Sequence, residues 1–143
     1  MFSSGKINAQ KINQFDKNKK RTGVWKKYYP NKRIRYTGQF ENGKEVGVFK
    51  FYHITTSKHP IIIKTFFEES DSLFVQFYTL GGKIETEGVL NGRKRVGNWK
   101  YFYADGTLMS EENYKDGKLE GEQLIYYPDG LVTEFAIYKN GLK

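Results

Sequence analysis

The sequence of 143 residues contains no cysteine. Disulfide bonds, thiolate metal sites and a cysteine nucleophile are therefore excluded. The chain also lacks any apolar run close to the roughly 18 residues that a membrane-spanning helix needs. The stretch from Met1 to Gln14 is polar and does not resemble a signal peptide. The sequence leaves the compartment open between the cytoplasm and, if a signal sequence has been removed, the periplasm or cell envelope.

Aliphatic side chains are scarce as well. Apolar residues make up 38% of the chain and the mean hydropathy is −0.71, yet aromatic residues supply 17%, including eleven Tyr and eleven Phe. Flat, amphipathic rings favour sheet faces and cross-strand ladders over a thick central core.

Positive charge is concentrated at one end of the chain. Residues 1–35 hold eleven Lys or Arg and a single acid, Asp16, whereas the remainder carries thirteen bases and fifteen acids. The net charge of +8 therefore arises entirely from the N-terminal quarter of the chain.

A repeat of 24 or 25 residues covers most of the chain. Its five units start at Gly23, Gly47, Ser72, Gly97 and Gly121. A large ring follows two positions after four of these starts, at Trp25, Phe49, Phe74 and Trp99. An aromatic residue stands five positions after every start, at Tyr28, Tyr52, Phe77, Phe102 and Tyr126.

Turn signals divide each unit into two strands. Asn or Asp followed by Gly closes four units, with the glycines at Gly43, Gly92, Gly117 and Gly141. Such pairs tolerate the positive φ of tight hairpins. We predict an all-β fold, an elongated and twisted antiparallel meander of about five stacked hairpins and ten strands over residues 22–143. No significant helix is expected, and at least one sheet face should stay partly open.

Strand alternation assigns the rings to faces. It places Trp25 and Tyr28 on opposite faces of the sheet, and likewise Trp99 and Phe102. The candidate partner surface is the set of rings five positions after each start: Tyr28, Tyr52, Phe77, Phe102 and Tyr126.

The second unit is irregular. The turn from His53 to Pro60 is long, Ile61 to Ile63 lack polar alternation, and Phe66 to Asp71 depart from the closing pattern. Two interpretations stay open: a degenerate repeat with a surface loop, and an insertion specific to a partner.

The repeat signature resembles that of a known family. The run from Gly97 to Gly106, followed by Tyr114-Lys115-Asp116-Gly117-Lys118, is similar to MORN repeats, and more closely to the bacterial MORN variants called YwqK-type and antitoxin-like. The resemblance extends over roughly residues 22–143, although Ser72 and Gln123 interrupt its frame. It implies stacked hairpins and a role in binding proteins or membrane surfaces, and it implies no reaction.

No catalytic or metal-binding pattern stands out. His53 and His59 lack recognised ligand spacing. Glu68-Glu69 and Glu111-Glu112 are adjacent pairs, and neighbours in a strand point to opposite faces, so we expect neither pair to converge on one substrate. Phosphate loops and nucleophile elbows are absent from the sequence. We therefore expect no enzyme activity and no cofactor.

Basic residues interleaved with rings provide a second candidate site, for an anionic partner. They are Lys19, Lys20, Arg21, Lys26, Lys27, Arg33 and Arg35, with a smaller cluster at Arg93, Lys94 and Arg95. A solvated strand edge, an acidic protein, an anionic lipid and a single-stranded nucleic acid all fit such a pattern, the nucleic acid least well.

The expected function is a non-catalytic scaffold that binds a protein, with an antitoxin-like role as one form of it. The alternative is a peripheral binder of anionic membrane through the basic end. Residues 1–21 form a polar, basic lead-in with Ile7, Ile12 and Phe15 as its candidate anchors. Two alternatives stay open for it: a partly disordered segment, and an edge strand from Ile12 to Asp16 that caps the first hairpin. The closing residues Asn140 to Lys143 read like a repeat about to continue, so end-to-end self-association also stays open.

Overall fold

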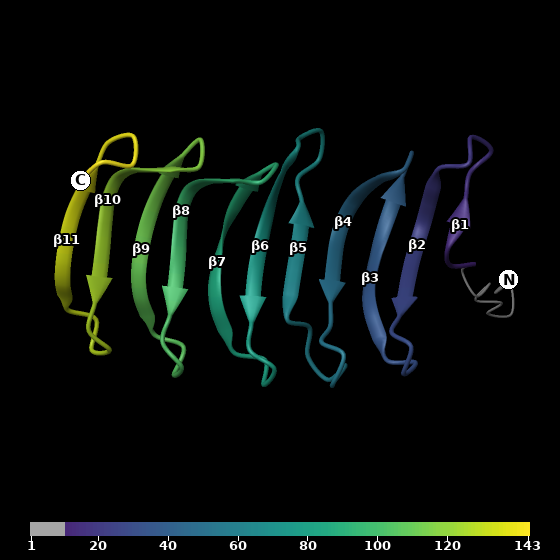
Figure 1. The fold of residues 1–143 in the computed structure, drawn as a ribbon, viewed down its shortest axis with the longest axis horizontal. Coiled ribbons are helices and arrows are strands. Elements are labelled where there is room, and N and C mark those ends of the chain that lie inside the picture. The colour runs from purple at the N-terminus through teal and green to yellow at the C-terminus, as the bar shows by residue number, and fades with distance from the viewer. Residues whose placement is uncertain (1–10) are drawn as a thin grey trace, which may run out of the picture.

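The computed structural model describes residues 11–143. These residues fold into a single antiparallel sheet. Eleven strands lie side by side in sequence order (Figure 1). They are β1 (Gln14–Phe15), β2 (Arg21–Tyr28), β3 (Ile34–Glu41), β4 (Lys44–Phe51), β5 (Ile62–Phe66), β6 (Ser72–Tyr78), β7 (Ile84–Asn91), β8 (Lys94–Phe102), β9 (Leu108–Lys115), β10 (Lys118–Tyr126) and β11 (Val132–Tyr138).

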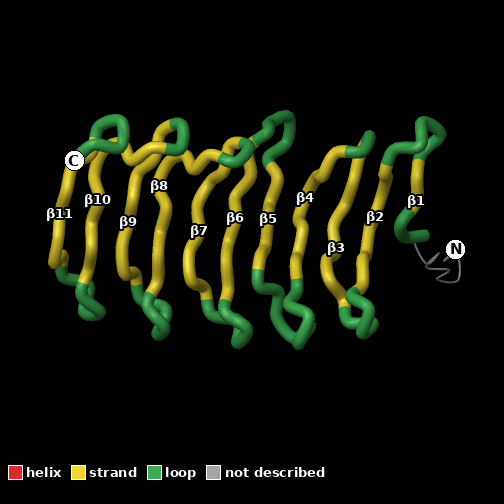
Figure 2. Tube along the Cα trace, viewed as in Figure 1, coloured by secondary structure: helices red, strands yellow, loops and turns green. Residues whose placement is uncertain are grey.

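The predicted all-β meander is confirmed. Residues 11–143 contain no helix, so none that could cross a membrane. Turns alternate between the two long edges of an open sheet, which we call the upper and lower edges as they appear in Figure 2. The Asn-Gly and Asp-Gly pairs form upper turns with positive φ, for example 51° at Asn42 and 77° at Gly43.

A short edge strand precedes the first repeat. In β1, Gln14 pairs with Thr22 and Phe15 pairs with Arg21. The Phe15 ring packs edge-on against Trp25 with 5.3 Å between centroids. Asn13 extends the pairing, because its side-chain amide donates to the Lys26 carbonyl oxygen and its amide oxygen accepts from the Lys26 N–H. The expected anchor Ile7 lies outside the described residues.

A glycine with positive φ bends three of the strands. Gly47, Gly97 and Gly121 have φ of 68°, 69° and 94°. At each of them the pairing with the preceding strand shifts, as between Val46 and Lys50, where three residues of β4 face the single Gly38 of β3. Bulges of this kind increase local twist and bend a strand. Figure 1 shows β4, β8 and β10 curving over near the upper edge.

The bend lays an aromatic ring over a glycine of the preceding strand. Phe49 covers Gly38, and Trp99 covers Gly88, so closely that a Cβ atom on either glycine would lie about 2.2 Å from the ring. The Trp99 indole N–H also donates to the Val89 carbonyl oxygen at 3.0 Å. A sheet without a second layer thus builds its core against its own backbone.

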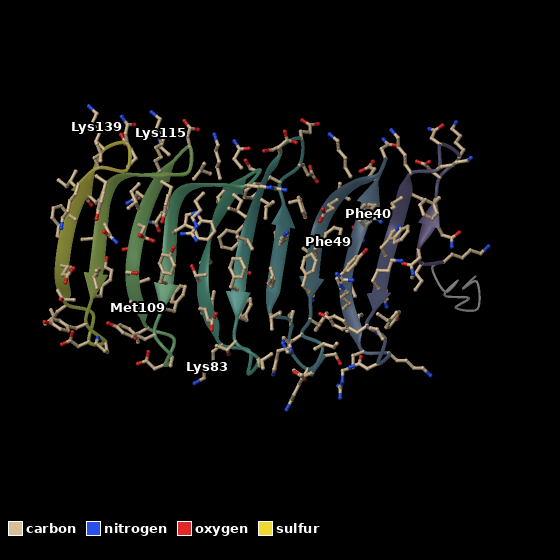
Figure 3. The ribbon with its side chains drawn as sticks, in the orientation of Figure 1. Phe40, Phe49, Lys83, Met109, Lys115 and Lys139 are labelled. Carbon is tan, nitrogen blue, oxygen red and sulfur yellow. The ribbon has the colours of Figure 1, made fainter. Side chains whose placement is uncertain are left out.

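Two small clusters form that core, on the face that we call the core face. The first joins Trp25, Phe40 and Phe49. Figure 3 shows Phe40 and Phe49 on neighbouring strands, and their centroids are 5.3 Å apart. The second joins Leu73, Val75 and Trp99. No side chain of β9, β10 or β11 is buried, so the C-terminal hairpins are held mainly by their ladders.

The third unit lies one residue away from the predicted register. Val75 pairs with Gly88 in the same way that Trp25 pairs with Gly38, so Val75 and not Phe74 is the equivalent of Trp25. Phe74 pairs with Val89 and points to the opposite face. In this register Leu73, which has no positive φ, stands where the other units have a glycine.

The ring-over-glycine contact predicts a large penalty for one added methyl group. Gly88→Ala should lower the free energy of unfolding by about 1–3 kcal/mol, because the Trp99 ring must move out of a packed site. Urea unfolding of the purified protein measures the change.

Gly81→Ala is the matched control. The nearest atom to its new Cβ is 3.8 Å away and its φ is not positive, so its stability should be unchanged or slightly higher. Equal stability of the two variants would contradict the packing that we describe.

Candidate binding surfaces

An aromatic band follows the lower edge of the sheet, on the outer face opposite the core. In four hairpins a ring pairs with an aliphatic residue of the returning strand: Tyr28 with Ile34, Tyr78 with Ile84, Phe102 with Leu108, and Tyr126 with Val132. Directly opposed residues share a face. Tyr52 and Ile61 occupy the corresponding positions beside β4 and β5, where alternation turns them away from the core residues Phe51 and Ile62.

The band therefore has ten apolar side chains, one in or directly beside each strand from β2 to β11. None of the ten is buried, and Tyr28 and Val132 are 55% and 52% exposed. The aliphatic half was missed in the sequence. The signal was present, because an aliphatic residue stands six positions after each ring in four hairpins.

Four of the five rings predicted to form a partner surface lie in this band. They are Tyr28, Tyr52, Phe102 and Tyr126. The fifth, Phe77, does not lie there, because it pairs with Ile62 and Thr86 and packs against the core cluster of Val75 and Trp99. Tyr78 takes its place, as the one-residue shift of the third unit requires.

Carboxylates on the outer face act on two of the phenols. The Tyr126 hydroxyl donates to a carboxylate oxygen of Glu111, and this hydrogen bond raises the pKa of Tyr126. Burial raises the pKa of Tyr78, and the negative charge of Glu87 adds to the effect. Both rings therefore present neutral hydroxyls at neutral pH.

On the core face, two hairpins repeat one arrangement. The Arg21 guanidinium lies 4.9 Å from the Trp25 ring and 5.2 Å from the Phe40 ring. The Arg95 guanidinium lies 5.0 Å from Trp99 and 5.5 Å from Tyr114. The two sets are 74 residues apart in the sequence. Contacts of this kind stabilise by about 0.5–1 kcal/mol at exposed sites.

A polar network extends from the second of these arrangements. Arg95 donates to the hydroxyls of Tyr101 and Tyr114 at 2.9 and 3.2 Å. Tyr114 in turn donates to Glu112, which also accepts from the Gln123 amide. The Arg95 guanidinium therefore already donates hydrogen bonds to other side chains of the protein.

The predicted basic residues do not form one surface. Lys19, Lys20 and Arg21 lie at the upper edge beside β1, and Arg93, Lys94 and Arg95 lie at the turn between β7 and β8. Lys26 and Lys27 alternate between the two faces of β2, while Arg33 and Arg35 lie at the lower edge. Arg21, Lys27 and Arg95 are stacked on rings.

The paired carboxylates separate as far as the strands dictate. Glu111 contacts Tyr126 on the outer face, whereas Glu112 belongs to the network on the core face. Glu68 and Glu69 lie in the turn between β5 and β6, so strand alternation does not describe that pair. Within residues 11–143 no three His, Asp or Glu side chains come together as a metal site would require.

The glycines of the repeat signature lie where the backbone bends or turns, and three of its rings lie in the core. Gly23, Gly47, Gly97 and Gly121 lie within β2, β4, β8 and β10 with positive φ, and Gly43, Gly92, Gly117 and Gly141 lie in upper turns. Trp25, Phe49 and Trp99 are buried in the core.

Two segments of the chain match a known family. The model of a family described as the MORN repeat variant matches residues 21–42 and 95–116. These segments are the hairpins β2–β3 and β8–β9, which hold the two Arg-over-Trp arrangements. No curated protein matches the chain.

The network around Glu112 predicts a loss of stability in alkaline solution. Burial raises the pKa of Tyr101 above its ordinary 10.0, and the hydrogen bond and charge of Glu112 raise it further. Above about pH 10 the unfolded chain loses this proton while the folded chain keeps it, so the free energy of unfolding falls with rising pH.

Tyr101→Phe should remove that component. Urea unfolding between about pH 9 and pH 11 measures it, and the wild-type protein should lose at most about 1.4 kcal/mol per pH unit more than the variant. Identical pH dependence of the two proteins would show that Tyr101 titrates equally in both states.

Proposed function

We propose that this protein is a non-catalytic scaffold that binds another protein through the aromatic band of its outer face. The observation that carries the proposal is the ring and aliphatic side chain that each hairpin places, partly exposed, on one face at the lower edge. Tyr and Phe supply large contact areas at a low entropic cost and are enriched at protein interfaces.

The dimensions of the band suit an extended contact. Ten neighbouring strands at about 4.8 Å spacing give a length of about 43 Å. No second layer of the protein covers it, because the described chain forms one sheet. Apolar surface arranged continuously on one face is typical of interaction sites, whereas scattered apolar residues are not.

Family resemblance and charge support this assignment over the membrane alternative. Repeats of the matched family are generally associated with binding to proteins or membranes. Membrane attachment through the basic residues would need them on one surface, and they lie on both faces and both edges of the sheet. An antitoxin-like role follows if the bound protein is a toxin.

A pair of exposed band residues tests the proposal. Tyr28→Ser with Val132→Ser removes apolar area at both ends of the band, at side chains that are more than half exposed. Affinity capture from cells of the source organism identifies the partner, and calorimetry with purified partner measures the affinity. The double variant should bind at least tenfold more weakly, because exposed aromatic anchors dominate such interfaces.

The matched control is Val48→Ser with Ile137→Ser. These side chains are 45% and 61% exposed and lie outside the band, so affinity should stay within about twofold. Phe77→Ala, on the core face, should lower stability and leave affinity unchanged. Equal affinity of the band variant and the wild-type protein would overturn the proposal.

Vesicles test the alternative directly. Phosphatidylcholine vesicles with and without phosphatidylserine are sedimented with the protein at low and physiological salt. Under the proposal neither type retains the protein. Retention by the anionic vesicles that fades with salt, together with capture of no protein, would favour membrane binding.

A further inference from the structure

A groove opens at the upper edge of the sheet, where the repeat is irregular. It has a volume of about 1110 Å³ and lies between the turn that joins β3 to β4 and the turn that joins β5 to β6. Three phenylalanine rings line the groove: Phe40, Phe66 and Phe67. Phe67 is 44% exposed, so the groove offers accessible apolar surface.

The two sides of the groove differ in turn length and in strand curvature. The turn between β3 and β4 has two residues, Asn42 and Gly43, whereas five residues separate β5 from β6. Gly47 bends β4, but Leu73, at the corresponding position of β6, has no positive φ. The core face of β6 carries Leu73 and Val75 in place of a tryptophan. One side of the groove therefore curves over and the other does not.

The lining of the groove has a charge opposite to that of the whole chain. It includes five carboxylates, from Glu41, Glu45, Glu68, Glu69 and Asp71, and two cations, from Arg21 and Lys44. The formal charge of the lining is therefore −3 in a chain of net charge +8. All five acids are exposed, and the Arg21 guanidinium is stacked on Trp25 and Phe40.

We propose that this groove binds a cationic segment of a partner protein in which Lys or Arg alternates with apolar residues. The rim attracts the ammonium or guanidinium groups, and the rings accept both the apolar residues and the aliphatic stems of the basic ones. A volume of this size accommodates several residues of an extended peptide. The aromatic band lies on the opposite face and at the opposite edge, so this site is separate from it.

A labelled peptide tests the proposal without knowledge of the natural partner. The probe is a fluorescein-labelled peptide of about ten residues that alternates Lys and Leu, and its anisotropy is measured against the full chain at low salt. A Glu–Leu peptide should not bind, and a Lys–Ser peptide should bind more weakly. Added salt should weaken the Lys–Leu complex, because the attracting carboxylates are exposed.

Charge reversal at the rim provides the decisive comparison. Glu41→Lys with Asp71→Lys changes the lining from −3 to +1 and should weaken binding of the Lys–Leu peptide at least tenfold. The control, Glu85→Lys with Glu134→Lys, changes the net charge of the protein equally at exposed carboxylates outside the groove. It should change the affinity by less than about threefold. Phe67→Ser should weaken binding severalfold while leaving all charges in place.

Three results would overturn the proposal. They are no binding of the Lys–Leu peptide at low salt, equal loss in the rim variant and the control, and full affinity of the rim variant. Circular dichroism and the unfolding midpoint establish that each variant is folded. Tyr28→Ser with Val132→Ser should leave peptide binding unchanged, so failure of this proposal and failure of the aromatic band remain distinguishable.

Discussion

The contact between an aromatic ring and a glycine of the preceding strand supports the rest of the structure. A sheet of one layer has no helix or second sheet against which to bury side chains, and two-stranded hairpins are marginal by themselves. Phe49 over Gly38 and Trp99 over Gly88 solve this problem within the sheet. Both parts of the contact depend on the bending glycines Gly47 and Gly97, since the bend brings the ring across the neighbouring strand.

The surfaces available for binding follow from the same constraint. Because side chains alternate, the strands that turn a ring toward the core also turn one outward three positions later, and repetition aligns the outward rings into the aromatic band. The acidic, ring-lined groove lies beside Phe67, next to the strand that lacks the bending glycine. The regular part of the repeat thus makes an extended surface, and its one irregular unit makes a localised one.

Much of the architecture is legible in the sequence because its determinants are local. Asn-Gly turns and alternating rings act over a few residues, so the all-β class and the antiparallel meander order are correctly predicted. The errors arise where register is not local. Phe77 was predicted to belong to the partner surface because it stands five positions after the start of its unit. Its pairing with Ile62 and Thr86 instead turns its ring toward the core. A one-residue slip reverses every side chain of a strand. Basic residues that are close in the sequence likewise do not share one surface in the fold. Lys26 and Lys27 point to opposite faces, and Arg95 donates hydrogen bonds to two tyrosines.

The sequence by itself determined that this chain forms a stack of hairpins, where each turns, and which rings recur. Turn geometry and strand alternation are properties of short segments, and their sequence signals recur through the five units of the repeat. Only the tertiary structure decided which side chains share a face in the third unit, which cations stack on rings, and where a groove opens. Those outcomes depend on how neighbouring strands pair. In the third unit Leu73 takes the place of the glycine, and the pairing lies one residue away from the register that the sequence pattern suggests.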